Sequence, residues 1–362
     1  MNPPPSADVL DRRLGVLLGA AVGDAYGTTL EFTGPAPAPW APALTGPHTD
    51  VVGGGPFGLV AGQITDDTQM ACCLAATLAE HGAAPPSSAA LDALAARYTA
   101  WVAEAFDVGN QTRGSLHALK RHPPSRAGFA AWDASGGKAA GNGALMRAAP
   151  LGTLTDPTIR RAWALADAGI THADPRCLLA NVAYADALAA GVGGADAAGM
   201  VEAARAGLDV ARAEAPTRSP LPAGDARWAA AHADLHHDLD AASRADPWLN
   251  GEATPPAGWP SGAASGLHLA GSMQGFVRVA FRVAFWQLRH AADWRAALVD
   301  TVNRGGDADT NGAIVGALLG ARHGASAIPA AWRARVLDAN PRAPWGASGP
   351  WHPRVLVGEP TT

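Results

Sequence analysis

The sequence has few cysteines, and their spacing follows no known framework. Cys72 and Cys73 are adjacent within an apolar run, and Cys177 lies far from both. This spacing excludes a disulfide scaffold and a zinc site built from paired cysteines. We therefore expect a protein of a reducing compartment, the cytoplasm.

An excess of positive charge and long apolar runs are lacking as well. Lys and Arg number 27 against 32 Asp and Glu, a formal net charge of −5, so no broad cationic surface is available to bind a phosphate backbone. No apolar run reaches the roughly 18 residues of a membrane span, and residues 1–8 lack the features of a signal peptide. We expect a soluble monomer with neither nucleic acid nor membrane as its main partner.

The two-residue alternation that is typical of β-strands is almost absent. Apolar residues recur instead at helical spacing, first in a helix expected from Val9 to Ala25. Further helical patterns cover residues 67–81, 88–106, 110–120, 157–170, 174–191, 195–213, 226–240, 272–290, 293–302, 310–322 and 329–337. The sequence therefore predicts an all-α fold.

No clear linker divides the chain, so we expect one domain over residues 8–345 and a C-terminal tail over 346–362. Residues 33–62 are rich in Pro and Gly and are predicted to form a long loop. Residues 213–266 combine Pro- and Gly-rich pieces with one short helix, and we expect a surface insertion there that covers a pocket or only pads the surface.

Two short acidic clusters are the most informative motifs present. They are Thr65-Asp66-Asp67-Thr68 and Asp307-Ala308-Asp309-Thr310, and each is followed by an apolar helical run. Carboxylates beside a hydroxyl offer hard oxygen donors that suit Mg²⁺ or Mn²⁺. Either cluster alone could instead be a helix N-cap. Two similar clusters together favour a metal site.

Other motifs are weaker. Residues 307–312 match the first half of an EF-hand loop, but Leu318 stands where that loop requires Glu. Residues 53–58 satisfy GxGxxG without the strand and helix of a dinucleotide site. Three histidines could share a helix face at metal spacing, but without the Glu of an HExxH site we interpret them as a solvated polar face. They are His232, His236 and His237.

Read in order, the two acidic clusters and three further segments resemble the ADP-ribosylglycohydrolase family. Residues 15–32, from Gly15 to Leu30-Glu31-Phe32, look like its opening helix and acidic residue. Residues 62–68 and 305–311 look like its two metal motifs. Gly141-Asn142-Gly143 and Thr171-His172 are similar to its ligand-binding motifs.

The resemblance implies an all-α fold with two Mg²⁺ or Mn²⁺ ions in a central cleft. Asp107 resembles the acidic residue that acts in the arginine-directed branch, and Glu31 is expected beside the metals, where it helps to position substrate or water. The implied metal ligands are Thr65, Asp66, Asp67, Asp307, Asp309 and Thr310. The implied substrate contacts are Asn110, Gly141, Asn142, Gly143, His172, Phe276, Gly305 and Gly306.

The implied function is metal-dependent removal of ADP-ribose from mono-ADP-ribosylated arginine on proteins, with release of free ADP-ribose. ADP-ribosylserine and O-acetyl-ADP-ribose stay open as substrates, because loops read the acceptor half. A non-catalytic, crystallin-like or ADP-ribose-binding member is another alternative, which retention of both acidic clusters disfavours. Phe276 stands where bacterial relatives often have Tyr, which puts one substrate contact in doubt.

Overall fold

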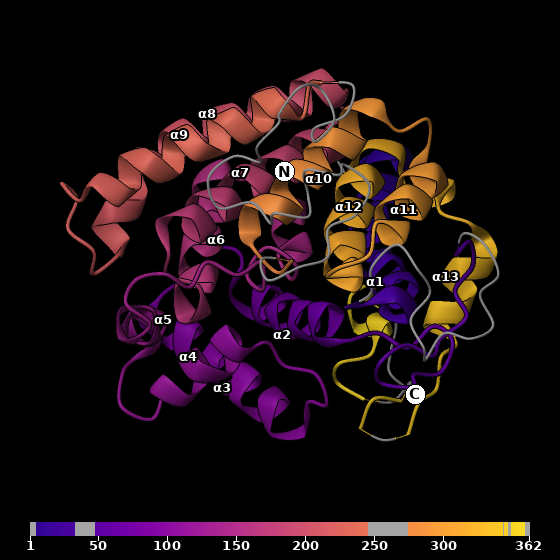
Figure 1. Ribbon diagram of the computed structural model, residues 1–362, viewed down its shortest axis with the longest axis horizontal. Helices are drawn as coiled ribbons and strands as arrows, with labels where there is room; N and C mark the ends of the chain where they lie inside the picture. Colours follow the sequence, from indigo (N-terminus) through magenta and orange to yellow (C-terminus); the bar gives the residue numbers. More distant parts are fainter. Residues whose placement is uncertain (1–4, 33–47, 245–273, 343, 347–348, 359–362) are drawn as a thin grey trace.

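The computed structural model describes residues 5–32, 48–244, 274–342, 344–346 and 349–358. These residues form thirteen α-helices and no strand, so the predicted all-α class is confirmed (Figure 1). The helices are α1 (Ala7–Gly27), α2 (Asp66–His81), α3 (Ser88–Glu104), α4 (Asn110–Ala118), α5 (Pro124–Ala134), α6 (Pro157–Thr171), α7 (Pro175–Val192), α8 (Ala197–Arg218), α9 (Ala226–Ala241), α10 (Val277–His290), α11 (Trp294–Asn303), α12 (Ala308–His323) and α13 (Ala330–Leu337).

Most helices begin at a side chain that caps them. In seven of the described helices a Ser or Asp accepts a hydrogen bond from a backbone N–H of the first turn, which would otherwise have no partner. The capping residues are Ser6, Ser87, Asp156, Asp174, Asp196, Asp225 and Asp293. Local sequence therefore fixes these starting points.

The centre of the fold is the antiparallel pair α1 and α12, which meet along glycines spaced four residues apart. A Cβ atom on Gly19 would lie 2.2 Å from the carbonyl oxygen of Gly316, and one on Gly23 would lie 2.0 Å from that of Gly312. Only glycine fits at this distance, and the lack of side chains at these positions allows the two backbones to approach closely. The approach brings the C-terminal end of α1 beside the N-terminal end of α12.

The largest differences from the sequence predictions concern α5, α10 and α8. Helix α5 was not predicted, because it has few large apolar residues and buries Gly128 against α6. Helix α10 begins at Val277, because Phe276 forms a short bridge with Gly141. Helix α8 continues to Arg218, so the first residues of the predicted insertion belong to a helix.

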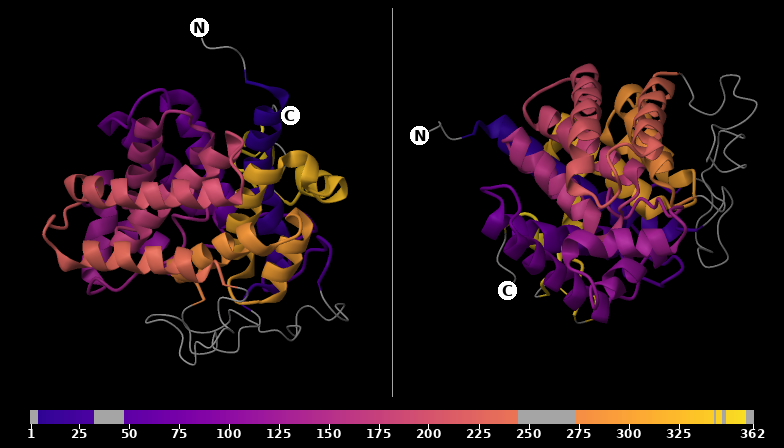
Figure 2. Two further views of the ribbon diagram at one scale, coloured as in Figure 1. Left: turned by 90° about the horizontal axis from the view of Figure 1, so that it is seen from above. Right: turned by 90° about the vertical axis from the view of Figure 1, so that its left-hand side faces the viewer.

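Helices α8 and α9 lie side by side and form one edge of the molecule (Figure 2). Trp228 and Asp238 of α9 are buried, so this part of residues 213–266 packs into the body of the domain. The rest of that insertion, residues 245–266, and residues 33–47 of the predicted loop lie outside the described residues. None of the described helices combines the length and apolar character needed to cross a membrane.

Candidate metal centre and active site

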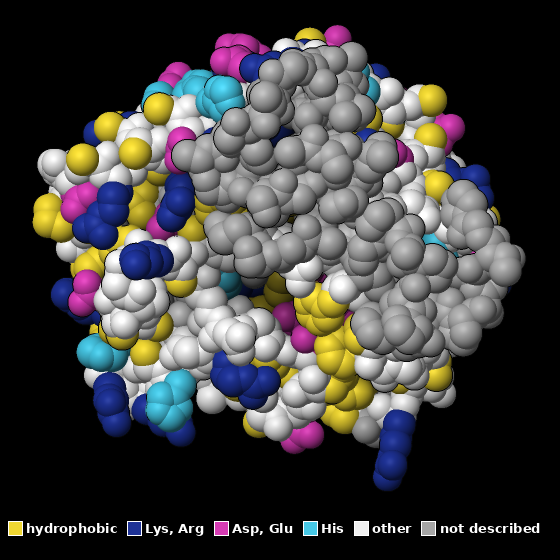
Figure 3. Space-filling model, in the orientation of Figure 1, with side chains coloured by type: hydrophobic (Ala, Val, Ile, Leu, Met, Phe, Trp, Pro, Cys, Tyr) yellow, Lys and Arg dark blue, Asp and Glu magenta, His cyan; other side chains and the backbone are white. Residues whose placement is uncertain are grey.

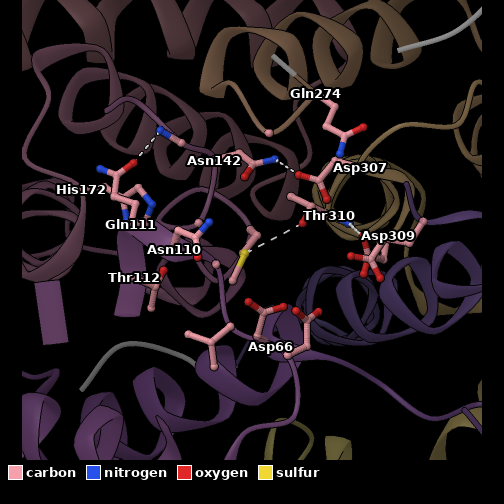
Figure 4. Close-up of a pocket in the computed structure, with 18 of the residues that line it drawn as sticks. Asp66, Asn110, Gln111, Thr112, Asn142, His172, Gln274, Asp307, Asp309 and Thr310 are labelled. Atoms are coloured by element: carbon pink, nitrogen blue, oxygen red, sulfur yellow. Dashed lines mark hydrogen bonds between the residues drawn. The ribbon is translucent and has the colours of Figure 1, made fainter. Parts of the chain in front are cut away.

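The two acidic clusters meet at one pocket of about 390 Å³. Acidic side chains are visible in a hollow near the middle of the face in Figure 3. Figure 4 shows Asp66 reaching the pocket from the start of α2, and Asp307, Asp309 and Thr310 reaching it from the start of α12. Residues far apart in the sequence are thereby brought into one acidic site.

Two groups of carboxylates are close enough to share a cation. The first group has oxygen atoms of Asp24, Asp67 and Asp309 within 4.8 Å of one another, and the second has oxygen atoms of Glu31, Asp307 and Asp309. Asp309 belongs to both groups. The two groups are therefore neighbours within one acidic cluster.

Asp24, on the last turn of α1, holds the start of α2 in place. Its Oδ1 accepts hydrogen bonds from the backbone N–H and the hydroxyl of Thr65, at 3.0 and 2.8 Å. Its Oδ2 accepts from the backbone N–H and the hydroxyl of Thr68, at 3.1 and 2.6 Å. Because Thr65 donates its hydroxyl proton to Asp24, the oxygen of that hydroxyl keeps lone pairs for a cation.

The N-cap interpretation of the acidic clusters does not hold for α2 and α12. Thr65 and Asp307 stand at the N-cap positions, yet neither side chain makes a capping hydrogen bond in the described structure. Asp24 supplies the acceptor for α2 instead. The side chains of Asp66 and Asp67 are thereby left for another role.

The carboxyl groups of the site raise one another's pKa values. Burial and the neighbouring Asp309, Asp107 and Asp307 raise the pKa of Glu31 to about 12. Burial, followed by the charges of nearby carboxylates, raises the pKa of Asp66 and Asp67 well above its usual range. Such a cluster is costly to ionise without a compensating positive charge.

Divalent cations fit this donor set. Among the described residues, Oε2 of Glu31 and Oδ1 of Asp67 are buried without a hydrogen-bond partner, and a buried carboxylate oxygen normally has one. Mg²⁺ and Mn²⁺ prefer oxygen ligands of this kind. A positive ion would also remove the mutual repulsion of the carboxylates.

Asp107 lines the pocket in the loop before α4, beside Asp66 of α2. Burial, together with the charges of Asp307 and Asp24, raises its pKa to about 6, although a hydrogen bond with the side chain of Asp66 opposes the shift. A carboxyl group with a pKa near neutrality is able both to give and to take a proton. Asp107 is therefore suited to acid–base chemistry.

The wall opposite the acidic clusters is built by residues 141–143 and His172. Gly143 has no room for a side chain, because a Cβ atom would lie 2.8 Å from Cε1 of His172. The hydroxyl oxygen of Thr171 accepts a hydrogen bond from Arg147 and lies 2.8 Å from Nδ1 of His172. The other ring nitrogen, Nε2, is left to bond with a ligand, as donor or acceptor according to the tautomer of the ring. Burial and the charge of Arg147 lower the pKa of His172 well below its usual range, which keeps the ring neutral.

Most of the predicted site residues line this pocket. They are Glu31, Asp66, Asp107, Asn110, Gly141, Asn142, Gly143, His172, Asp307, Asp309 and Thr310. Asn142 also donates a hydrogen bond to Oδ2 of Asp307 at 2.7 Å, which joins the two sides (Figure 4).

The other predicted residues lie just outside the lining. Thr65 and Asp67 are buried beneath it. The hydroxyl of Thr65 donates a hydrogen bond to Asp24, and Asp67 belongs to the carboxylate group of Asp24 and Asp309. Gly305 and Gly306 turn the chain into α12 with positive φ angles of 71° and 72°. Phe276 is buried, and its ring lies under the guanidinium of Arg176 rather than in the pocket.

Several residues were not singled out from the sequence. Asp24 had one available signal, an acidic residue within an otherwise small and apolar helix. Gln111 accepts a hydrogen bond from the backbone N–H of Gly141 and so fixes that wall. Phe32 stands at the pocket with a φ of 59°, a conformation that non-glycine residues rarely adopt. No local sequence pattern indicates Gln111 or Phe32.

Comparison with known proteins identifies relatives over most of the chain. The chain is 30% identical over 331 residues to the ADP-ribosyl-[dinitrogen reductase] glycohydrolase of Rhodospirillum rubrum, covering 91% of each protein. It is 28% identical over 333 residues to the ADP-ribosylarginine hydrolase Tri1 of Pseudomonas putida, covering 90% of this chain and 74% of that protein. A solved structure described as an ADP-ribosylglycohydrolase-related protein complex is 30% identical, with a TM-score of 0.60, over 90% of this chain and 92% of that one.

The family profile gives the same result. The profile described as ADP-ribosylglycohydrolase matches residues 5–347. That range includes both acidic clusters, the α1–α12 pair and the loop that carries Asp107. The expected family is therefore confirmed: this chain belongs to the ADP-ribosylglycohydrolase family.

Proposed function

We propose that this protein is a metal-dependent hydrolase that removes ADP-ribose from mono-ADP-ribosylated arginine on proteins and releases free ADP-ribose. The main support is the meeting of both acidic clusters and Asp107 in one pocket. The choice of arginine rests on the similarity to proteins named for ADP-ribosylarginine and ADP-ribosylated dinitrogen reductase. We further propose that it acts as a cytoplasmic monomer.

Six residues would hold the two ions, with Mg²⁺ or Mn²⁺ as the proposed metals. They are Thr65, Asp66, Asp67, Asp307, Asp309 and Thr310. When bound, such ions supply a Lewis acid that binds the ribose hydroxyls and lowers the pKa of an attacking water. Glu31, whose carboxylate is near that of Asp309, would orient that water or the ribose.

Asp107 is the proposed proton carrier. Cleavage of the bond between ribose and arginine leaves a strongly basic guanidine, which departs more readily if a carboxyl group hands it a proton. The raised pKa of Asp107 supports this role. Across the pocket, Nε2 of His172 and the amide of Asn142 would hold polar groups of the ligand.

One assay separates the candidate substrates. The purified protein is incubated with arginine-, serine- and acetyl-linked ADP-ribose, with Mg²⁺ or Mn²⁺ and with a chelator, and released ADP-ribose is measured by chromatography. We expect release from the arginine linkage that depends on the metal. Release only from serine or acetyl linkages would reassign the acceptor, and binding of ADP-ribose without any release would indicate a non-catalytic member.

Substitution of a metal ligand should abolish turnover. We expect Asp307→Ala and Asp66→Ala to lose essentially all hydrolysis while circular dichroism shows unchanged helical content, because both side chains face the pocket rather than the apolar core. Asp92→Ala is the control, since Asp92 is exposed on α3. Full activity of either pocket variant would contradict the proposed site.

A further inference from the structure

A second group of metal-binding side chains lies away from the pocket, between α8 and α9. It consists of Asp209 on α8 and of His232 and His236, one helical turn apart on α9. Histidine side chains are visible at the surface over these two helices in Figure 3. The sequence analysis interpreted these histidines as a solvated face, but it had no means of placing Asp209 beside them.

Three atoms of this group form a tight triangle. Nε2 of His232 lies 2.8 Å from Oδ1 of Asp209, and Nε2 of His236 lies 3.2 Å from the same oxygen. The two Nε2 atoms are 3.1 Å apart. The histidine rings are partly buried, with side chains 28% and 25% exposed.

Protons alone cannot satisfy all three contacts. A carboxylate oxygen only accepts, so both Nε2 atoms must carry a proton to bond with Asp209. The contact between the two histidines is then a contact of two donors. If one histidine gives up that proton, its contact with Asp209 becomes a contact of two acceptors. A cation at the centre removes the conflict, because all three atoms then present lone pairs to it.

From this geometry we propose that Asp209, His232 and His236 form a binding site for Zn²⁺ or a similar transition-metal ion that joins α8 to α9. Two imidazole nitrogens and one carboxylate oxygen are a typical ligand set for zinc, with bonds of about 2.0–2.2 Å. Ligand atoms around a tetrahedral zinc then lie about 3.3 Å apart, so the triangle needs to open by only a few tenths of an ångström. A water molecule completes the coordination. Imidazole ligands separate this site from the hard, all-oxygen site in the pocket.

The side chain of Arg205 affects which tautomer His236 adopts, and so affects metal binding. Its Nη1 lies 3.3 Å from Nδ1 of His236, and its Nη2 forms an ion pair with Asp240. Arg205 can only donate, so it favours a His236 with Nδ1 unprotonated and Nε2 protonated. Zinc requires the opposite tautomer, with Nδ1 protonated and Nε2 on the metal. Arg205 must therefore turn away when the ion binds.

The experiment uses the full-length protein without a histidine tag, saturated with Mg²⁺. Zn²⁺ is titrated by calorimetry, and Co²⁺ is used as a visible probe, because tetrahedral Co²⁺ absorbs strongly and six-coordinate Co²⁺ weakly. We expect one Zn²⁺ site per chain and a tetrahedral Co²⁺ spectrum. His232→Ala, His236→Ala and Asp209→Asn should each weaken Zn²⁺ binding by about 100-fold or more, since even changes around a ligand typically cost roughly 10- to 100-fold. Arg205→Gln should tighten it, because the Gln oxygen can accept the Nδ1 proton.

His237→Ala is the matched control, because His237 is exposed on the same helix but outside the triangle. It should bind Zn²⁺ as the unchanged protein does. The proposal is overturned if the unchanged protein shows no such site, if His237→Ala loses binding equally, or if Asp209→Asn binds normally. Weaker binding in Arg205→Gln would contradict coordination through Nε2 of His236.

Discussion

At the scale of single residues, Asp24 determines how the first acidic cluster, residues 65–68, is oriented at the pocket. Its two oxygens accept hydrogen bonds from four donor groups, the backbone N–H and the hydroxyl of both Thr65 and Thr68, so it caps α2 from another helix. Burial raises its pKa to about 6 even though those bonds oppose the shift. Asp24 is thus a positioning residue that fixes the direction of Thr65, Asp66 and Asp67.

We predict that Asp24→Asn weakens metal binding by roughly 10- to 100-fold, as is typical when a group that orients a ligand is lost. An amide nitrogen cannot accept the bonds that one oxygen of Asp24 accepts, so Thr65 or Thr68 must turn. The measurement is Mg²⁺ or Mn²⁺ titration by calorimetry.

Asp11→Asn is the matched control, because Asp11 is on the same helix and its carboxylate accepts bonds from the backbone and hydroxyl of Ser326, away from the pocket. It should leave metal binding unchanged. Equal affinities for the Asp24 variant and the unchanged protein would show that Asp24 does not organise the site.

The same residue shows the limit of local sequence patterns. Thr65, Asp66 and Asp67 could be singled out because their chemistry is visible within four consecutive residues. The role of Asp24 depends on contacts 41 and 44 residues along the chain. Asp209 likewise gains its meaning only from histidines on the next helix.

At the scale of elements, the pairing of α1 with α12 sets the width of the site. Glycines at positions 15, 19 and 23 face glycines at 320, 316 and 312, and any Cβ there would meet backbone atoms. Backbone atoms cannot rotate away as side chains can. A wider separation would pull Asp24 away from Asp309.

We predict that Gly19→Ala lowers the free energy of unfolding by about 1–3 kcal/mol or more, the usual cost of overpacking. The added methyl would lie 2.2 Å from the oxygen of Gly316. Gly114→Ala is the control, since Gly114 is exposed in α4 with nothing within 4 Å of the added Cβ. It should raise stability by up to about 1 kcal/mol through helix propensity. Denaturant unfolding measures both, and equal effects in the two variants would contradict the close packing of α1 and α12.

Helix positions were predictable where apolar spacing and caps agree, as in α6, α7 and α9. Helix α5 escaped prediction because its contact with α6 uses a glycine, which has no apolar side chain to mark a buried face. The start of α10 escaped prediction because residues 275–277 bond to the chain around Gly141, a tertiary contact.

At the scale of the whole molecule, the fold concentrates negative charge in one place. Seven carboxyl groups lie at or beneath the pocket, and burial is the largest cause of the raised pKa of each. They are Asp24, Glu31, Asp66, Asp67, Asp107, Asp307 and Asp309. The charges of neighbouring carboxylates raise the pKa further in five of them, all except Asp24 and Asp307. The packed core holds these groups close together. Without metal, the repulsion between their charges therefore lowers the free energy of unfolding.

This arrangement predicts an unusual pH dependence for the metal-free protein. A carboxyl group whose pKa is raised in the folded state contributes stability below its unfolded pKa, near 3.9, and loses it as the pH rises through the folded value. For Asp24 and Asp107 the folded value is about 6. Chelated protein should therefore lose stability between about pH 4 and pH 7, on the order of 3 kcal/mol from Asp24 alone.

Divalent metal should reverse the loss, because a cation replaces the protons that the carboxylates give up. The increase in melting temperature caused by Mg²⁺ or Mn²⁺ should grow as the pH rises over the same range. Calorimetry with and without chelator, at a series of pH values, measures both effects. In Asp307→Ala the repulsion within the site is reduced and a ligand is lost, so both effects should shrink together. A melting temperature of the chelated protein that rises with pH across this window, or a metal effect that is equal at every pH, would contradict the assignment of these carboxylates to a cation site.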